Sequence, residues 1–140
     1  MSILFFSNNL INFFLNTKSD PKQHTLAKYF MELTLHDAEF SSFDPSYLAA
    51  CSLCLAFKLL AKDDESPWSK QLEYYSTYTQ EFLISGMQKI AKLVIKASDV
   101  EYKYRAATNK YTSSKFFRIS LLSELSSAFI KDLALNGTFA

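Results

Sequence analysis

Glycine and proline, the residues that most often interrupt regular structure, are scarce in this chain. Its 140 residues include only 2 glycines and 3 prolines, which is few for a domain built from many short strands and tight turns. Long stretches without either residue favour helices instead. A chain of this length is large enough to bury a sizeable core as one domain. The composition therefore predicts a single, mostly helical domain.

An excess of charge of one sign is also lacking. The chain carries 15 basic and 14 acidic residues, and no basic block forms the surface that nucleic acids require, so we expect no nucleic-acid partner. No apolar run approaches the roughly 20 residues of a membrane-spanning helix, so we expect no membrane partner. The apolar start, 1–15, has no basic residue before it, and we interpret it as a first helix rather than a signal peptide.

Cysteine is limited to a single CxxC pair, Cys51 and Cys54. No second pair of ligands stands at zinc-site spacing, and no strand precedes the pair as in a redox motif, so we predict small buried thiols and no cofactor. The sequence also lacks a phosphate loop, a nucleophile motif and paired carboxylates, so we expect no enzyme. His36 and Asp37, at a predicted helix end, are interpreted as turn or cap residues.

Aromatic and other apolar side chains at helical spacing are abundant, including 13 Phe and 8 Tyr. From Leu48 to Leu60 they cover every side of one helix, which Asp44 and Pro45 open, and a helix that is apolar all round is buried all round. We therefore predict an all-α domain of five principal helices around this buried central helix, plus a short helix and a C-terminal helix. The predicted helices cover residues 1–17, 21–37, 45–60, 69–75, 79–94, 100–107 and 121–133, with Thr79 as the cap of its helix and Gly137 just beyond the last.

The candidate binding residues are His24 and Lys28, four positions apart in the first turns of the 21–37 helix. This spacing places them on one side of the helix, opposite its apolar stripe. The N-terminal end of a helix favours an anion, and a lysine and a protonated histidine can donate charge-assisted hydrogen bonds to a phosphate. A solvated polar face is the alternative interpretation of the same pair.

Three blocks of sequence, in order and at plausible separations, carry a family resemblance. Together they resemble the second, C-terminal box of a cyclin, and most closely that of a mitotic B-type cyclin. The resemblance covers residues 23–134, preceded by a partly divergent first helix and connection at 1–22 and followed by a tail at 135–140. The blocks are His24–Thr34, then Pro45–Leu60 with Trp68, Tyr74, Tyr75 and Tyr78, then Asn109–Tyr111, Ser114, Lys115, Ile119, Ser120, Ser127, Ala128 and Asp132–Ala134.

The resemblance implies a regulatory, non-catalytic subunit of a cyclin-dependent protein kinase complex in mitotic cell-cycle control, located in nucleus and cytoplasm. In that family the first box supplies most of the kinase contact and a groove for substrate motifs. The resemblance here does not include that box, so we expect a truncated form that cannot activate the kinase alone. The family also implies a phosphate pocket with a histidine and a lysine spaced like His24 and Lys28, which would bind phosphorylated regulatory proteins. Its arginine, from the preceding helix, falls near Asn16 and Thr17 here.

Other interpretations stay open on the sequence. The chain could be a lone cyclin-like adaptor or a degenerate fragment that binds other proteins without regulating a kinase. A general transcription factor shares the fold, but near-neutral charge speaks against DNA binding. A surface normally covered by the first box would expose apolar side chains, so we expect self-association. Arg118–Leu121 matches the RxxL pattern of destruction motifs, but its position inside the domain indicates a chance match.

Overall fold

The computed structural model describes residues 21–60 and 70–137, and within these ranges every regular element is helical. This confirms the all-α prediction, while the expected helix at 1–17 lies outside the described residues. The elements are α2 (Pro21–Leu35), η1 (Ala38–Phe40), α3 (Pro45–Leu59), α4 (Lys70–Ser76), α5 (Gln80–Ala97), α6 (Ala106–Lys110), η2 (Ser114–Phe116), η3 (Ile119–Leu121), η4 (Ser123–Ser126) and α7 (Ala128–Asn136), where η denotes a 3-10 turn.

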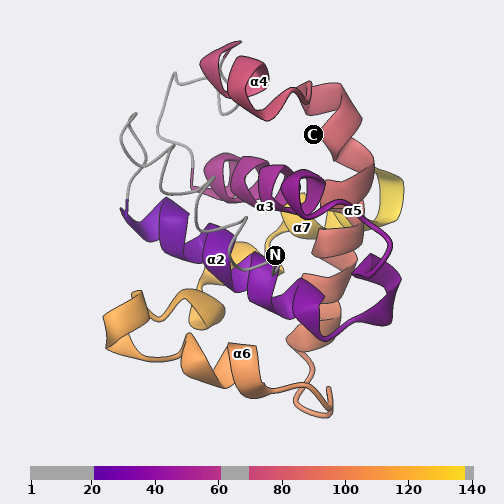
Figure 1. Ribbon diagram of the computed structural model, residues 1–140. Coiled ribbons are helices and arrows are strands. Elements are labelled where there is room, and N and C mark those ends of the chain that lie inside the picture. Colours follow the sequence, from indigo (N-terminus) through magenta and orange to yellow (C-terminus); the bar gives the residue numbers. More distant parts are fainter. Residues whose placement is uncertain (1–20, 61–69, 138–140) are drawn as a thin grey trace.

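Helix α3 lies at the centre of the domain, as the sequence predicts (Figure 1). Both α2 and α5 pack directly against it, and α7 packs on α5. Nine consecutive residues of α3, 48–56, are buried. Each fully buried leucine side chain stabilises the fold by about 2 kcal/mol relative to an exposed one. The stability of α3 therefore comes from enclosure on all sides and not from one apolar face.

The crossing of α3 and α5 is unusually close at Gly86. The Tyr47 hydroxyl donates to the carbonyl of Phe82 at 2.9 Å and accepts from the Gly86 N–H at 3.2 Å. A Cβ atom on Gly86 would lie 2.5 Å from the Cys51 Sγ and 2.8 Å from the Tyr47 ring. Real Cβ atoms do not approach other atoms so closely, so α5 reaches this position only because residue 86 has no side chain.

Several predicted helix ends are confirmed. The Thr79 side chain caps α5 by accepting from the Phe82 N–H at 3.2 Å. Gly137 follows α7 with a φ of 66°, the left-handed conformation that favours glycine at this position. The Gln23 side-chain amide donates to the Leu60 carbonyl at the C-terminal end of α3 and so ties the start of α2 to α3.

The predicted helix at 100–107 is wrong over most of its length. Residues 100–105 form a turn, and α6 begins only at Ala106. The Arg105 guanidinium donates to the carbonyls of Ala97 and Asp99, and so holds this turn against the end of α5. Val100 is 83% exposed. Its apolar side chain therefore contributes nothing to the core that helical spacing suggested.

The predicted stripe at 121–133 is only partly one helix. Residues 119–126 form the turns η3 and η4, and α7 begins at Ala128. The Ser126 hydroxyl donates to the Ser123 carbonyl, and Ser127 adopts an extended conformation with a ψ of 163°. Serine side chains that bond the local backbone compete with the hydrogen bonds of a helix. This competition stops the helix short of Leu121, which is 63% exposed.

The substitution Gly86→Ala should destabilise the domain by about 1–2 kcal/mol, because overpacking against Cys51 and Tyr47 outweighs the gain in helix propensity. Urea unfolding followed by circular dichroism measures this free energy. Lys92→Ala, at an exposed position of the same helix, is the control and should change stability by less than about 0.5 kcal/mol. A Gly86→Ala protein as stable as the unsubstituted one would contradict the close packing.

Candidate functional site

His24 and Lys28 both lie on α2, one turn apart, as predicted. The prediction that both project from an exposed polar face is wrong for His24, which is only 8% exposed. Helix α2 contacts α3, α5 and α6, and most of its residues from His24 to Thr34 are buried; the rest of that stretch is partly exposed. Thr25, Lys28 and Glu32 are the partly exposed residues there and lie along one stripe of the helix.

Burial changes the electrostatics of His24. The pKa of its imidazole is lowered from 6.5 to about 4, first because burial removes water from the charged form and then because the Lys28 ammonium is nearby. The ring is therefore neutral at neutral pH. Its Nε2 atom is buried and has no hydrogen-bond partner in the part of the chain that the structure describes. A buried polar atom without a partner costs the folded state about 1–3 kcal/mol.

The Lys28 ammonium pairs with no carboxylate among the residues that the structure describes. The acidic residue one turn further along the same stripe, Glu32, pairs with Lys110 at 2.7 Å. The first turn of α2 carries no acidic residue. No acidic residue of α2 therefore neutralises the Lys28 ammonium. This positive charge and the N-terminal end of the helix both favour binding of an anion. Asn16 and Thr17, where the family's arginine would stand, lie outside the described residues.

The two cysteines are buried free thiols, as the sequence predicts. Burial raises the pKa of both, that of Cys54 to about 12, so neither is a thiolate near neutral pH. Within 21–60 and 70–137, no three histidine, cysteine or acidic side chains stand close enough to hold a metal ion. In the same ranges, no helix is both long and apolar enough to span a membrane.

The remaining candidates have structural roles. The Asp37 side chain accepts from the Glu39 N–H at 3.0 Å and caps η1, which confirms the predicted turn role. His36 stacks on Tyr104, with 13° between the ring planes. The RxxL segment Arg118–Leu121 is anchored in the fold, because its isoleucine is fully buried and its serine hydroxyl donates to the backbone of α6.

Comparison with known proteins agrees with this all-helical domain around a central helix. The family described as "Cyclin, C-terminal domain" matches residues 2–125, and the chain belongs to the cyclin family. It is similar to the G2/mitotic-specific cyclin-B2 of Gallus gallus (46% identical over 117 residues), the G2/mitotic-specific cyclin-B of Spisula solidissima (47% over 115) and the G2/mitotic-specific cyclin-B2 of Homo sapiens (43% over 115). These alignments cover 84%, 82% and 82% of this chain, but only 29%, 26% and 28% of the relatives. The chain thus spans less than a third of the length of these relatives.

His24 makes the stability of the domain depend on pH. Because its pKa is lower in the folded state, the unfolded chain binds a proton between pH 6.5 and 4 that the folded chain does not. The free energy of unfolding is therefore highest above pH 6.5 and falls as the pH is lowered. The loss from this histidine is about 1–2 kcal/mol between pH 7 and pH 5. His24→Gln should remove this part of the slope, measured by urea unfolding at a series of pH values.

The other histidine offers a matched control. His36 is exposed, and the His36→Gln variant is the control for replacing a histidine outside the core. Because Gln at position 24 can itself change stability, the quantity to compare is the slope with pH and not the stability at one pH. An identical slope in the His24→Gln and unsubstituted proteins would contradict the burial of a neutral imidazole.

Proposed function

We propose that this chain acts as a non-catalytic regulatory part of a cyclin-dependent protein kinase complex in mitotic cell-cycle control. The observation that carries the proposal is the 43–47% identity to G2/mitotic-specific cyclins over more than four fifths of the chain. Cyclins are regulatory proteins without catalytic activity of their own. On this proposal the chain works by binding, in the nucleus and cytoplasm.

Mechanistically, the domain would offer the kinase a rigid platform. Both α2 and α5 pack on the enclosed helix α3 and on each other, so the surfaces of those helices would keep a constant geometry. The matched region does not include the family's first box, which carries most of the kinase contact. We therefore propose that this stretch binds the kinase but does not activate it alone. An adaptor that binds other proteins and no kinase is the alternative.

Exposed apolar side chains support self-association as a further part of the proposal. Phe82, Leu121, Leu135 and Val100 are 61%, 63%, 79% and 83% exposed. Large apolar side chains at a surface favour contact with another protein surface. A second copy of the chain can supply that surface when no kinase is present.

Gel filtration with light scattering, on the chain alone and mixed with a mitotic cyclin-dependent kinase, tests this function. The chain alone should elute above the mass of a monomer, and the mixture should give a stoichiometric complex without increased histone phosphorylation. A Val100→Ser, Leu135→Ser double variant should shift the chain alone toward monomer. Both side chains are largely exposed, so the substitutions should remove apolar surface without disturbing the core. Separate elution of chain and kinase would favour the adaptor, and a monomeric unsubstituted chain would remove the self-association.

We also propose that His24 and Lys28 bind a phosphorylated segment of a partner protein. What supports this is the buried Nε2 atom of His24 near the Lys28 ammonium, at the N-terminal end of a 15-residue helix, neither of which has a partner among the residues that the structure describes. A phosphate would receive a charge-assisted bond from Lys28, and its negative charge would raise the pKa of the neutral imidazole. Binding would then be coupled to proton uptake.

A phosphoserine peptide titrated by calorimetry tests this site at neutral pH. Lys28→Glu should weaken binding at least about tenfold, because it replaces the charge-assisted bond by repulsion. Lys92→Glu, an exposed lysine on α5, changes the net charge equally and should leave the affinity nearly unchanged. Equal weakening by the two variants would indicate a general charge effect, and equal binding by all three proteins would reject the site.

A further inference from the structure

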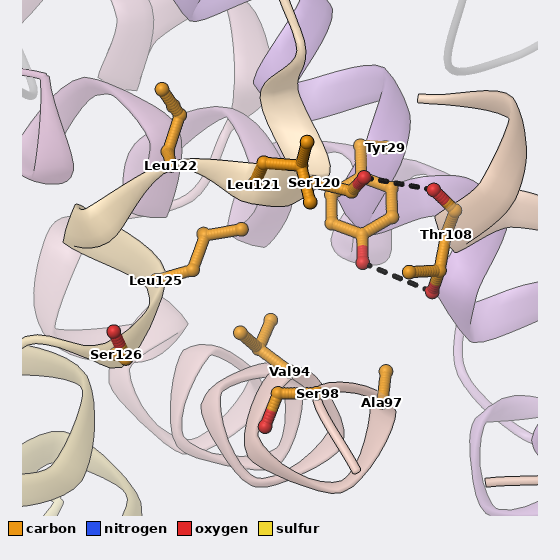
Figure 2. A pocket seen from close by; sticks show the side chains of 10 residues that line it. All are labelled: Tyr29, Val94, Ala97, Ser98, Thr108, Ser120, Leu121, Leu122, Leu125 and Ser126. Atoms are coloured by element: carbon orange, nitrogen blue, oxygen red, sulfur yellow. Dashed lines mark hydrogen bonds between the residues drawn. The ribbon is translucent and has the colours of Figure 1, made fainter. Parts of the chain in front are cut away.

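A second candidate site lies away from His24 and Lys28, in a half-open cavity of about 200 Å³ between α5 and the η3–η4 segment. Figure 2 shows leucines of that segment and Val94 of α5 along its apolar side, with Tyr29, Thr108 and Ser120 grouped at the other end. The cavity therefore has one apolar side and one end that carries hydroxyl groups. Its lining residues come from α2, α5, α6 and the two 3-10 turns.

The hydroxyl protons of this cavity can be counted. Ser98, Ser120 and Ser126 each donate their proton to a backbone carbonyl, so these three donors are used. Tyr29 and Thr108 share one hydrogen bond of 3.3 Å. Each hydroxyl carries one proton and one bond uses only one of them, so the pair retains a proton without an acceptor among the described residues.

This surplus donor is well shielded from solvent, since Tyr29 is 3% and Thr108 is 7% exposed. Every residue that lines the cavity is uncharged. The Arg105 guanidinium is near enough to act on the pKa of Tyr29, but it does not line the cavity and donates to the carbonyls of Ala97 and Asp99. A charged ligand would therefore lose its hydration here without an ion pair to a lining residue, whereas an acceptor atom would engage the free proton. The lining thus selects against charge and in favour of one hydrogen-bond acceptor.

We propose that this cavity binds an uncharged small molecule that carries a hydrogen-bond acceptor at one end of an apolar body. The acceptor receives the free proton of the Tyr29–Thr108 pair, and the apolar body contacts Val94, Leu122 and Leu125. An apolar cavity of about 150 Å³ in another protein holds benzene, so about 200 Å³ suits a benzene ring with a few further atoms. This site is independent of the phosphate-binding proposal and of the kinase partner.

Three ligands of similar shape test the proposal on the full chain: acetophenone has an acceptor, ethylbenzene has none, and benzoate is charged. Methyl NMR spectra of Val94, Leu122 and Leu125 report binding, with Leu53 of α3, which does not line the cavity, as the reference. Acetophenone should shift the three cavity methyls and leave Leu53 unchanged, and benzoate should shift none of them. If acetophenone shifts none of the three methyl signals, the cavity holds water only and the proposal is overturned. Benzoate that binds as well as acetophenone would also overturn it.

Substitutions then test the donor itself. Tyr29→Phe and Thr108→Val each leave one hydroxyl with a free proton, so each single variant should keep the preference for acetophenone over ethylbenzene. The double variant has neither hydroxyl proton. The ratio of its affinities for acetophenone and ethylbenzene should therefore fall about fivefold, which corresponds to the free energy of one hydrogen bond. An unchanged preference in a folded double variant would overturn the donor's role.

If the double variant does not fold, the substitution Ser98→Leu, at the exposed rim of the cavity, tests the proposal instead. The larger side chain should close the cavity and abolish the methyl shifts that acetophenone causes. Methyl shifts that persist in this variant would overturn the proposal.

Discussion

The close contact of α5 with α3 at Gly86 is the constraint on which the arrangement of the other helices depends. A helix that is apolar on every side must be covered on every side, and α3 meets this condition only if its neighbours come near enough. The missing side chain at Gly86, together with the small Cys51, allows that approach. Because α7 packs on α5, the position of α5 also decides where the C-terminal part of the domain lies.

A second set of contacts joins α2 to the irregular C-terminal half. The Tyr29 ring lies 5.3 Å from that of Tyr111, its hydroxyl meets Thr108, and Glu32 pairs with Lys110. These contacts hold α6 beside α2, and of the turns that follow α6, η3 packs on α2 and η4 packs on α5 and α7. The cavity lies between α5 and these turns, where short 3-10 turns fill less space than a continuous helix would. The irregular segment and the candidate ligand site therefore have one origin.

The burial of His24 gives the domain's proposed phosphate site its particular chemistry. On an exposed helix face a histidine and a lysine would act together as cations. Here the imidazole is held neutral, with its pKa lowered to about 4, and only Lys28 is charged in the free protein. A site of this kind responds to its ligand by taking up a proton, so burial links recognition to pH as well as to stability.

The sequence by itself determined the all-α class, the central helix, the buried thiols, the caps at Thr79 and Gly137, and the cyclin resemblance. These follow from local causes: periodicity, capping chemistry and the spacing of residue types. Only the tertiary structure decided that His24 is covered, that residues 100–105 turn instead of continuing a helix, and that 119–126 break into 3-10 turns. In each case groups distant in sequence or in competition decide the outcome, such as Arg105 with the end of α5, or Ser126 with the backbone of Ser123. Helical periodicity describes which side of a helix a residue faces, but packing against other elements decides what covers that side.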